Sequence, residues 1–264
     1  MIERRTMWRG QRAAADRYGE PDAAKFFRLS QRELHELLTG DPEIAARWLR
    51  VAAEHGLPAA QVRFGRMLLE GRGVAQDAAA ALGWFQTAAR SHDAEAMNMV
   101  GRCFENGWGT AKDMSAAAHW FGKSAAAGHD WGQYNFGHML LDGSGGLERD
   151  PAQALSWYLK AAGQGHARAM NLVARCHEEG WGTARDPAAS FHWYRRSAEG
   201  GYFRGQYNYA TSLLQQGEIA RAADWFWRAA ESGTPELRRI IAGRLLGSAI
   251  PALIAIGERV LALG

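Results

Sequence analysis

The sequence predicts an all-α protein, a solenoid of about six helix-turn-helix repeats with a C-terminal capping helix region. Two observations predict this fold class. The segment 94–110 returns as the closely similar segment 167–183, and the Gly-Gln-Tyr-Asn sequence at 132–135 returns at the same offset at 205–208. Between these copies, pairs of aromatic residues and pairs of Ala recur at about half that spacing. Helical patterns with periods of roughly 34 to 47 residues are typical of solenoids, in which each unit packs on its neighbours.

The composition is that of a folded helical protein. Among 264 residues, 47% are hydrophobic and 22% are charged, with 31 Gly and only 7 Pro. The net charge of +3 comes from scattered basic residues such as the pair Arg195-Arg196. Nucleic-acid-binding proteins usually gather Lys and Arg on one face or in one run, so no nucleic-acid partner is expected. The richness in Ala, Arg and Gly is typical of bacteria with GC-rich genomes.

The cysteines and the hydropathy pattern predict a cytoplasmic protein without a membrane span. Cys103 and Cys176 occupy equivalent places two repeats apart, which is beyond the roughly 7 Å between Cα atoms that a disulfide allows. Two buried, reduced thiols are typical of the cytosol. The N-terminus shows no apolar stretch of the signal-peptide kind, and no run reaches the roughly 18 apolar residues of a spanning helix.

The chain is expected to divide into three parts. Residues 1–57 hold a polar N-terminal helix over 3–18 and a degenerate first repeat over 22–57. Residues 58–234 hold clearer repeats, over about 58–93, 94–130, 131–166, 167–202 and 203–234. Residues 235–264 form C-terminal capping helices.

Each clear repeat is predicted to consist of a helix A, a glycine-rich turn and a helix B. In one of them, helix A covers about 94–106 and helix B about 113–127. Gly107 ends helix A because Gly tolerates positive φ, and Asp113 caps the start of helix B. Small residues alternate with large ones along both helices, which lets the two helices approach closely.

The C-terminal part is predicted to close the array. The final repeat is shorter because residues 215–218 replace the long turn, and arrays commonly end in such atypical units. A capping helix is expected over 235–247. Residues 249–263 are apolar apart from Glu258 and Arg259, which predicts a terminal helix that covers the end of the core. The alternative is self-association, or contact with a membrane surface, through 249–263.

At these positions the chain resembles the Sel-one-like repeat family, a relative of the tetratricopeptide repeat with a slightly longer period. Helix A matches at 133–137 and 206–209, and the turn matches at 71–74. Helix B matches at Trp84, Trp120, Trp157, Trp193 and Trp225. The resemblance covers 58–234 as five repeats and is weaker over 22–57. It implies a right-handed α/α superhelical solenoid that acts as an adaptor, scaffold or regulator.

The resemblance also implies a concave groove lined by the A helices. The residues of this chain at the groove-facing positions are Val62, Arg66, Glu70, Glu95, Asn98, Arg102, Glu105, Trp131, Tyr134, His138, Asp142, Arg168, Asn171, Arg175, Glu178, Arg204 and Tyr207. From this row and from the Gly-x-Gly turns, the predicted partner-binding residues are Arg66, Asn98, Arg102, Trp108, Trp131, Tyr134, His138, Asn171, Arg175, Trp181 and Tyr207.

Asn98 and Asn171 depart from the family pattern, which has an aromatic residue there. Asn is unfavourable inside a helix, and an Arg follows each one a turn later, Arg102 and Arg175. An Asn amide can bond a peptide backbone, and Arg offers a planar fork to a carboxylate or a phosphate. The pattern predicts two matched contacts to an extended or anionic ligand. The alternative is tandem duplication, with each Asn bonded inside the array.

Aromatic residues form a second set of candidates. Trp108 and Trp181 lie in the Gly-x-Gly turns, where an exposed Trp would be a contact residue. The alternative is a ring that folds onto the adjacent repeat. Trp131 departs from the family pattern and is a candidate contact, whereas Tyr134 and Tyr207 match the pattern and are better explained by packing.

No catalytic residue, metal site or cofactor is predicted. The sequence lacks the His-x-x-x-His and Cys-x-x-Cys spacings of metal sites, a phosphate-binding Gly loop and a Gly-x-Ser-x-Gly motif. His119 and His192 are equivalent positions of different repeats, so they are too far apart to share an ion.

The predicted function is that of a non-enzymatic interaction scaffold or adaptor, which holds a protein or peptide segment in its concave groove. One alternative is an accessory or regulatory subunit of an enzyme or of an envelope or metal-uptake system, because bacterial members of the family resemble such helpers. A less favoured alternative is a hydrolase. Secreted relatives linked to antibiotic hydrolysis carry paired Cys within each repeat, which this chain lacks.

Overall fold

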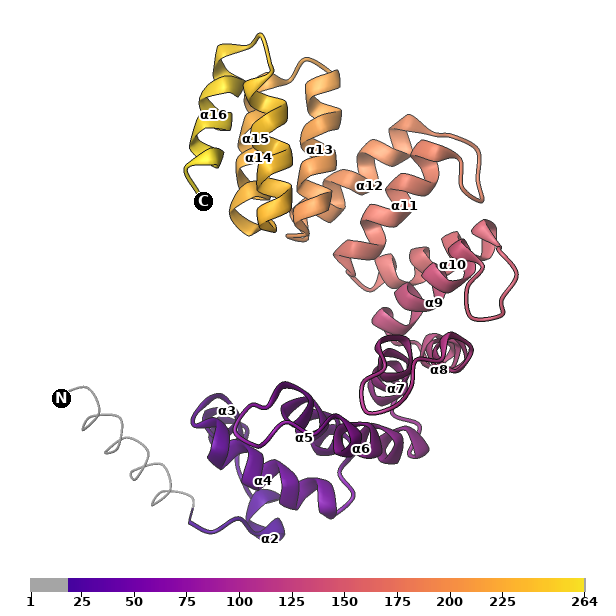
Figure 1. Cartoon of the computed structure of the whole chain (residues 1–264), viewed down its shortest axis with the longest axis vertical. Helices are drawn as coiled ribbons and strands as arrows, with labels where there is room; N and C mark the ends of the chain where they lie inside the picture. Colours follow the sequence, from indigo (N-terminus) through magenta and orange to yellow (C-terminus); the bar gives the residue numbers. More distant parts are fainter. Residues whose placement is uncertain (1–18, 264) are drawn as a thin grey trace, which may run out of the picture. The chain divides into compact units, whose positions relative to one another are not determined.

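The computed structural model describes residues 19–263, and every regular element in that range is an α-helix (Figure 1). The helices are α2 (Ala23–Phe26), α3 (Gln31–Thr39), α4 (Pro42–Glu54), α5 (Pro58–Glu70), α6 (Ala78–Arg90), α7 (Ala94–Asn106), α8 (Met114–Ala126), α9 (Asp130–Asp142), α10 (Pro151–Gly163), α11 (Ala167–Glu179), α12 (Pro187–Glu199), α13 (Phe203–Gln215), α14 (Ile219–Ser232), α15 (Pro235–Leu246) and α16 (Pro251–Leu261). None of them is long and apolar enough to cross a bilayer. The helix predicted over 3–18 lies outside the described residues. The prediction of an all-α repeat fold is confirmed for the described chain.

The described chain forms two compact units, which divide between Gly132 and Gln133. In the first unit α4 packs on α5, and the series continues through α6, α7 and α8. In the second unit α10 to α14 form the same kind of series. Each unit has its own core, in which Trp48 and Phe85 are among the large buried side chains of the first unit and Tyr158 and Tyr209 among those of the second.

Polar caps and glycines set the ends of the helices. Asp77 and Asp113 precede α6 and α8, and each side chain accepts a hydrogen bond from the backbone N–H three residues later, at 2.9 Å. These bonds satisfy donors that the first helical turn leaves unpaired. Gly107 ends α7 in the left-handed conformation, with φ of 75°. Helix A therefore spans the predicted residues 94–106, and helix B begins one residue later and ends one residue earlier than predicted.

Within a repeat, the two helices meet where a small residue of helix A faces an aromatic ring of helix B. A Cβ atom on Gly101 would lie 2.6 Å from the Phe121 ring, and the same distance separates a Cβ on Gly65 from the Phe85 ring. Real Cβ atoms essentially never approach a neighbour this closely. The absence of a side chain on helix A therefore lets the ring of helix B fill the layer between the two helices.

Successive repeats are joined by the second glycine of the Gly-x-Gly turn. Gly109 has φ of +70°, and a Cβ atom there would lie 2.2 Å from the carbonyl oxygen of Ala78 at the start of α6. Gly182 makes the same approach to Pro151 at the start of α10, at 2.3 Å. The turn of one repeat thus rests on the first turn of helix B in the repeat before it, which only glycine permits.

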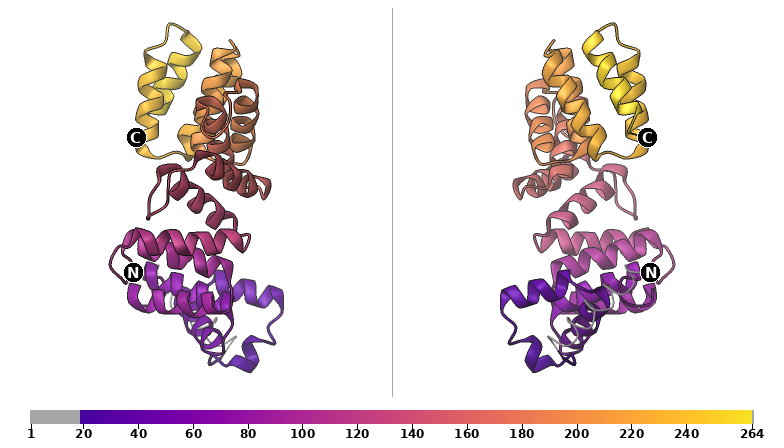
Figure 2. Two further views of the ribbon diagram at one scale, coloured as in Figure 1. Left: turned by 90° about the vertical axis from the view of Figure 1, so that its right-hand side faces the viewer. Right: turned by 90° about the vertical axis from the view of Figure 1, so that its left-hand side faces the viewer.

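The last two helices pack on the end of the second unit. Helix α16 contacts both α14 and α15, and the three segments appear side by side as the orange and yellow ribbons of Figure 2. Leu253 and Val260 of α16 are buried there, and Arg259 lies 4.2 Å from the Trp227 ring centroid. The buried residues of α16 are Leu253, Gly257 and Val260, while Leu261 stays 63% exposed.

Replacement of Gly109 tests the contact between repeats. The change Gly109→Ala places a side chain at positive φ against backbone atoms of α6, so we expect it to lower the free energy of unfolding by about 2 kcal/mol or more. The matched control is Gly83→Ala, because Gly83 lies in the exposed interior of α6 with nothing within 4 Å of an added Cβ. The control should raise stability by about 0.5–1 kcal/mol. Equal effects of the two changes in urea unfolding would contradict the contact.

The two cysteines should be inert in the folded protein. Cys103 and Cys176 are fully buried, and burial raises the pKa of each thiol to about 11. Because the thiolate is the reactive form, we expect almost no reaction with a thiol reagent at about pH 8 and full reaction of both after denaturation. The variant Ser91→Cys, which places a thiol at an exposed position, is the positive control. Rapid labelling of the wild-type chain in the native state would contradict this prediction.

Candidate functional site

Each unit carries one hollow formed along its A helices. Hollow 1 has a volume of about 820 Å³ and is lined by Arg66, Leu69, Glu70, Gln76, Ala78, Glu95, Asn98, Met99, Arg102, Trp108, His129 and Trp131. Hollow 2 has a volume of about 380 Å³ and is lined by Tyr134, His138, Arg168, Asn171, Leu172, Arg175, Tyr202, Phe203, Arg204, Tyr207, Asn208, Thr234, Glu236, Leu237 and Ile240. Both combine arginine, asparagine and aromatic side chains.

The structure brings nearly all of the predicted contact residues into one or other hollow. Arg66, Asn98, Arg102, Trp108 and Trp131 line hollow 1. In the second unit the residues in the hollow are Tyr134, His138, Asn171, Arg175 and Tyr207. Trp181 is not part of the lining, although it contacts Arg175.

Some of the positions expected in the groove lie elsewhere. Val62 is 1% exposed and belongs to the core of the first unit, because the fifth position of α5 turns inward. Glu105, Asp142 and Glu178 lie outside the lining of both hollows. The carboxylate of Glu178 instead accepts a hydrogen bond from the Tyr194 hydroxyl at 2.5 Å.

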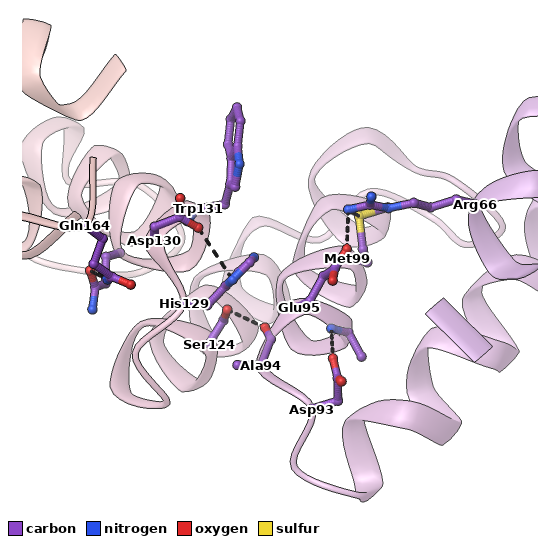
Figure 3. A network of polar contacts seen from close by, with 12 residues as sticks. Arg66, Asp93, Ala94, Glu95, Met99, Ser124, His129, Asp130, Trp131 and Gln164 are labelled. Atoms are coloured by element: carbon purple, nitrogen blue, oxygen red, sulfur yellow. Dashed lines mark hydrogen bonds and ion pairs between the residues drawn. The ribbon is translucent and has the colours of Figure 1, made fainter. Parts of the chain in front are cut away.

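The charges in hollow 1 are partly paired with each other. Figure 3 shows Arg66 of α5 reaching Glu95 of α7, with 2.6 Å between the guanidinium nitrogen and the carboxylate oxygen. The same nitrogen lies 3.9 Å from the sulfur of Met99. Trp131, on α9, is 38% exposed. Hollow 1 therefore offers an ion pair, a second arginine and a large exposed aromatic surface.

The two turn tryptophans pack beneath arginines of their own repeats. The guanidinium carbon of Arg102 lies 4.9 Å from the Trp108 ring centroid, and that of Arg175 lies 4.7 Å from the Trp181 centroid. Both rings are half-buried and pack against the core. The alternative in which each ring folds down thus describes the structure better than a freely exposed Trp. Stacking holds each guanidinium flat and leaves its edge donors available.

The matched asparagines form the base of the hollows. Asn98 is 4% exposed and Asn171 is 5% exposed. The Nδ2 group of Asn208 on α13 donates a hydrogen bond of 2.8 Å to Oδ1 of Asn171 on α11. The alternative of bonding inside the array therefore holds for Asn171, whose amide joins two neighbouring repeats.

Hollow 2 contains a cluster of aromatic rings around His138. The His138 ring centroid lies 4.7 Å from that of Tyr134 and 5.7 Å from that of Tyr158. Burial lowers the pKa of His138, and the nearby charge of Arg175 lowers it further, while Asp142 opposes both. His138 is therefore a neutral ring at neutral pH, able to donate one hydrogen bond and accept another.

One wall of hollow 2 comes from outside the repeats, and the sequence prediction missed it. Leu237 and Ile240 of α15 line the hollow, and Ile240 is 55% exposed. The available signal was the Ile240-Ile241 pair, because two adjacent residues on a helix cannot both face the core. Phe203 was missed as well, since an aromatic residue at the first position of helix A is easily explained by packing.

The described residues include no metal-binding group, and their two thiols lie outside both hollows. No three His, Cys, Asp or Glu side chains in the range 19–263 come close enough together to hold a metal ion. Neither Cys103 nor Cys176 lines a hollow, and both thiols have raised pKa values through burial. The arrangement is suited to contact with a ligand through stacked arginines and exposed rings.

Comparison with protein families gives a match along most of the chain. A family model described as Sel1 repeat matches residues 27–57, 58–93, 94–129, 132–166, 167–202 and 204–234. A search of curated proteins gave no match.

Solved structures share the fold. A Sel1 repeat protein from Oxalobacter formigenes has a TM-score of 0.77 and 22% sequence identity, covering 87% of this chain and 96% of that one. The protein c5321, described as a protective antigen present in uropathogenic Escherichia coli strains with an SLR fold, has a TM-score of 0.69 at 26% identity. That match covers 98% of this chain but only 56% of c5321. The immunity protein Pa5087 from Pseudomonas aeruginosa has a TM-score of 0.54 at 16% identity, with 78% of each chain covered.

Protonation of His138 should weaken the second unit. Because the pKa of His138 in the folded chain lies below the usual 6.5, the unfolded chain takes up this proton first as the pH falls. Stability therefore falls as the pH drops below 6.5 towards the folded-state pKa, by at most about 1.4 kcal/mol per pH unit, and this effect is absent above 6.5. Urea unfolding at about pH 7.5 and 5.5 should show a smaller difference for His138→Gln than for the wild type. The control His119→Gln, at an exposed position, should keep the wild-type difference. An unchanged difference in His138→Gln would contradict the assignment.

Proposed function

The chain belongs to the Sel1 repeat family, whose repeats are generally protein–protein interaction modules, and we propose that it binds a polypeptide segment in hollows 1 and 2 without catalysing a reaction. The observation that carries the proposal is the repeated pairing of an arginine with a tryptophan. Arg102 and Trp108 in the first unit, and Arg175 and Trp181 in the second, take up the same stacked arrangement at equivalent positions.

A stacked arginine is well suited to polypeptide recognition. Arg and Trp are enriched among the residues that carry most of the binding energy in protein interfaces. Stacking on the ring restricts the long Arg side chain before a partner arrives, so less entropy is lost on binding. The edge of the guanidinium can then donate to backbone carbonyl groups or to a carboxylate.

The remaining lining supplies contact area and orientation. Trp131 in hollow 1 and Tyr134 and Tyr207 in hollow 2 present rings with polar edges, which are typical of interface residues. The Tyr207 hydroxyl accepts a hydrogen bond of 3.0 Å from Arg244, which fixes its ring. Asn98 and Asn171 are 4% and 5% exposed, so they shape the base of the hollows and leave little surface for a partner. Asn171 also joins two repeats through Asn208.

The C-terminal segment is the weaker candidate for a partner surface. Leu253 and Val260 of this segment are each 1% exposed and pack inside the unit, whereas Leu261 and Leu263 stay 63% and 38% exposed. The hollows instead expose rings and cations to a partner. A partner that is itself an enzyme would use the same surfaces, so an accessory role is a special case of this proposal.

Reversal of charge at the two stacked arginines should abolish partner capture. Affinity capture from a native lysate with Arg102→Glu and Arg175→Glu combined should recover the partner at about one-tenth of the wild-type yield or less. The helical circular dichroism should be unchanged, because both arginines are exposed. The control combines Arg63→Glu with Arg196→Glu, which change the net charge equally but lie outside both hollows.

A photocrosslinker locates the contact directly. Placed at Trp131 it should crosslink to the captured partner, whereas the same group at exposed Lys112, which is outside both linings, should not. Capture that survives the double reversal, or equal crosslinking from both positions, would overturn the proposal.

A further inference from the structure

We propose that hollow 2 selects an acidic polypeptide segment that also carries apolar side chains, whereas hollow 1 does not select for acidic charge. This inference rests on the proposed function and specifies the chemistry of the segment that one of the hollows binds.

The two hollows differ in charge because of one repeated position. The second residue of helix A is Glu95 and then Trp131 in the repeats that form hollow 1. At the corresponding positions of the copied segments, hollow 2 has Arg168 and Arg204. One carboxylate and one indole are thus replaced by two guanidinium groups on otherwise similar helices.

The lining of hollow 2 holds more arginine than acidic side chains. Arg168, Arg175 and Arg204 line it, and Glu236 is the one acidic residue of its lining. Among residues 19–263, neither Arg175 nor Arg204 forms an ion pair within 4.0 Å. In hollow 1, by contrast, Glu95 already pairs with an arginine at 2.6 Å. Because arginines that share a small volume repel one another, an added carboxylate gains energy in hollow 2 that it does not gain in hollow 1.

All three arginines are oriented by aromatic rings. The guanidinium carbon of Arg168 lies 5.5 Å from the Tyr202 ring centroid, and that of Arg204 lies 5.9 Å from the Phe203 centroid. Arg175 stacks on its tryptophan in the same way. The N–H donors of a guanidinium group lie along its edge, where a carboxylate binds with two parallel hydrogen bonds.

The apolar wall indicates a polypeptide ligand. Phe203, Leu237 and Ile240 lie in the same hollow as the arginines, and Ile240 is 55% exposed. A side chain of Leu or Phe next to an acidic residue would cover this wall, whereas a phosphate or a free carboxylate would leave it in water.

Two further arginines of the second unit are paired with carboxylates. Arg185 pairs with Glu179 at 3.9 Å, and Arg195 pairs with Glu199 at 2.8 Å. Both ion pairs lie outside the lining of the hollow. Nucleic-acid binding depends on several unpaired cations spread along a surface, whereas the arginines of hollow 2 lie beside an aliphatic wall.

Direct binding of defined peptides to the full chain tests the inference. The probes are a short fluorescein-labelled peptide of alternating Glu and Leu, the same peptide with Gln in place of Glu, and a labelled oligothymidylate. Fluorescence anisotropy should show that the Glu peptide binds about tenfold or more tightly than the Gln peptide. Its affinity should fall as the ionic strength is raised from about 0.1 M to about 1 M, because the Debye length then falls from about 10 Å to about 3 Å.

A matched pair of double variants assigns the selectivity to hollow 2. Arg168→Gln with Arg204→Gln should bring the affinity for the Glu peptide down to that for the Gln peptide. The control is Arg196→Gln with Arg228→Gln, because both arginines stack on tryptophans at 4.6 Å outside the hollows. The control removes the same charge and the same kind of stacking, and it should leave the selectivity unchanged.

The outcomes separate this inference from the proposed function. Equal binding of the Glu and Gln peptides, no binding of either, or an equal loss in both double variants would overturn the acidic selectivity, and so would tighter binding of the oligothymidylate. In each of those cases, capture that still depends on Arg102 and Arg175 would leave the proposed function standing. If capture is also independent of these two arginines, both proposals fail.

Discussion

The close approach between a small residue of helix A and an aromatic ring of helix B is the constraint on which the rest of the structure depends. Gly101 has no side chain, so the Phe121 ring takes up the layer between the two helices. The ring then accounts for much of the burial in the repeat, and helix A presents its opposite side to the hollow. Ala174 and Tyr194 are both buried at the corresponding positions of a later repeat. Because the backbone of helix A lies so close to the ring of helix B, only small residues such as Gly or Ala fit at this position of helix A.

This packing divides the positions of each A helix into those that stabilise the fold and those that can contact a partner. Positions that face the aromatic ring are fixed by volume, and positions such as Glu95 and Arg168 are partly or largely exposed and are not part of the core. A change of charge at an exposed position costs little folding free energy, usually within about 0.5 kcal/mol. A duplicated pair of repeats can therefore keep its fold while its two copies acquire hollows of different charge.

Local signals in the sequence determine the parts that could be predicted. An Asp before helix B and a Gly after helix A mark helix ends through bonds to nearby backbone, so 94–106 was predicted to the residue. The resemblance to the repeat family also placed Asn98 and Arg102 in the groove, and both line hollow 1. Contacts between repeats were not predictable, because they depend on rotamers and on distances across the stack. The bond between Asn208 and Asn171 is one such contact. The contact of Arg102 with Trp108 lies within one repeat, but it depends on how the turn folds back, which the sequence does not show.

The wall formed by α15 shows why a repeat pattern alone cannot define a binding surface. Leu237 and Ile240 do not belong to the repeated unit, and yet they complete hollow 2 beside Arg204. A helix that closes an array must bury one side on the last repeat. The residues of that helix next to its buried side can then line the hollow of the last repeats. Since Ile241 is fully buried, Ile240 is turned about a quarter of a helical turn away from the core and towards the arginines. The end of the array thereby gains an apolar wall from outside the repeats. A hollow next to a capping helix can therefore bind charged and aliphatic side chains of one ligand together.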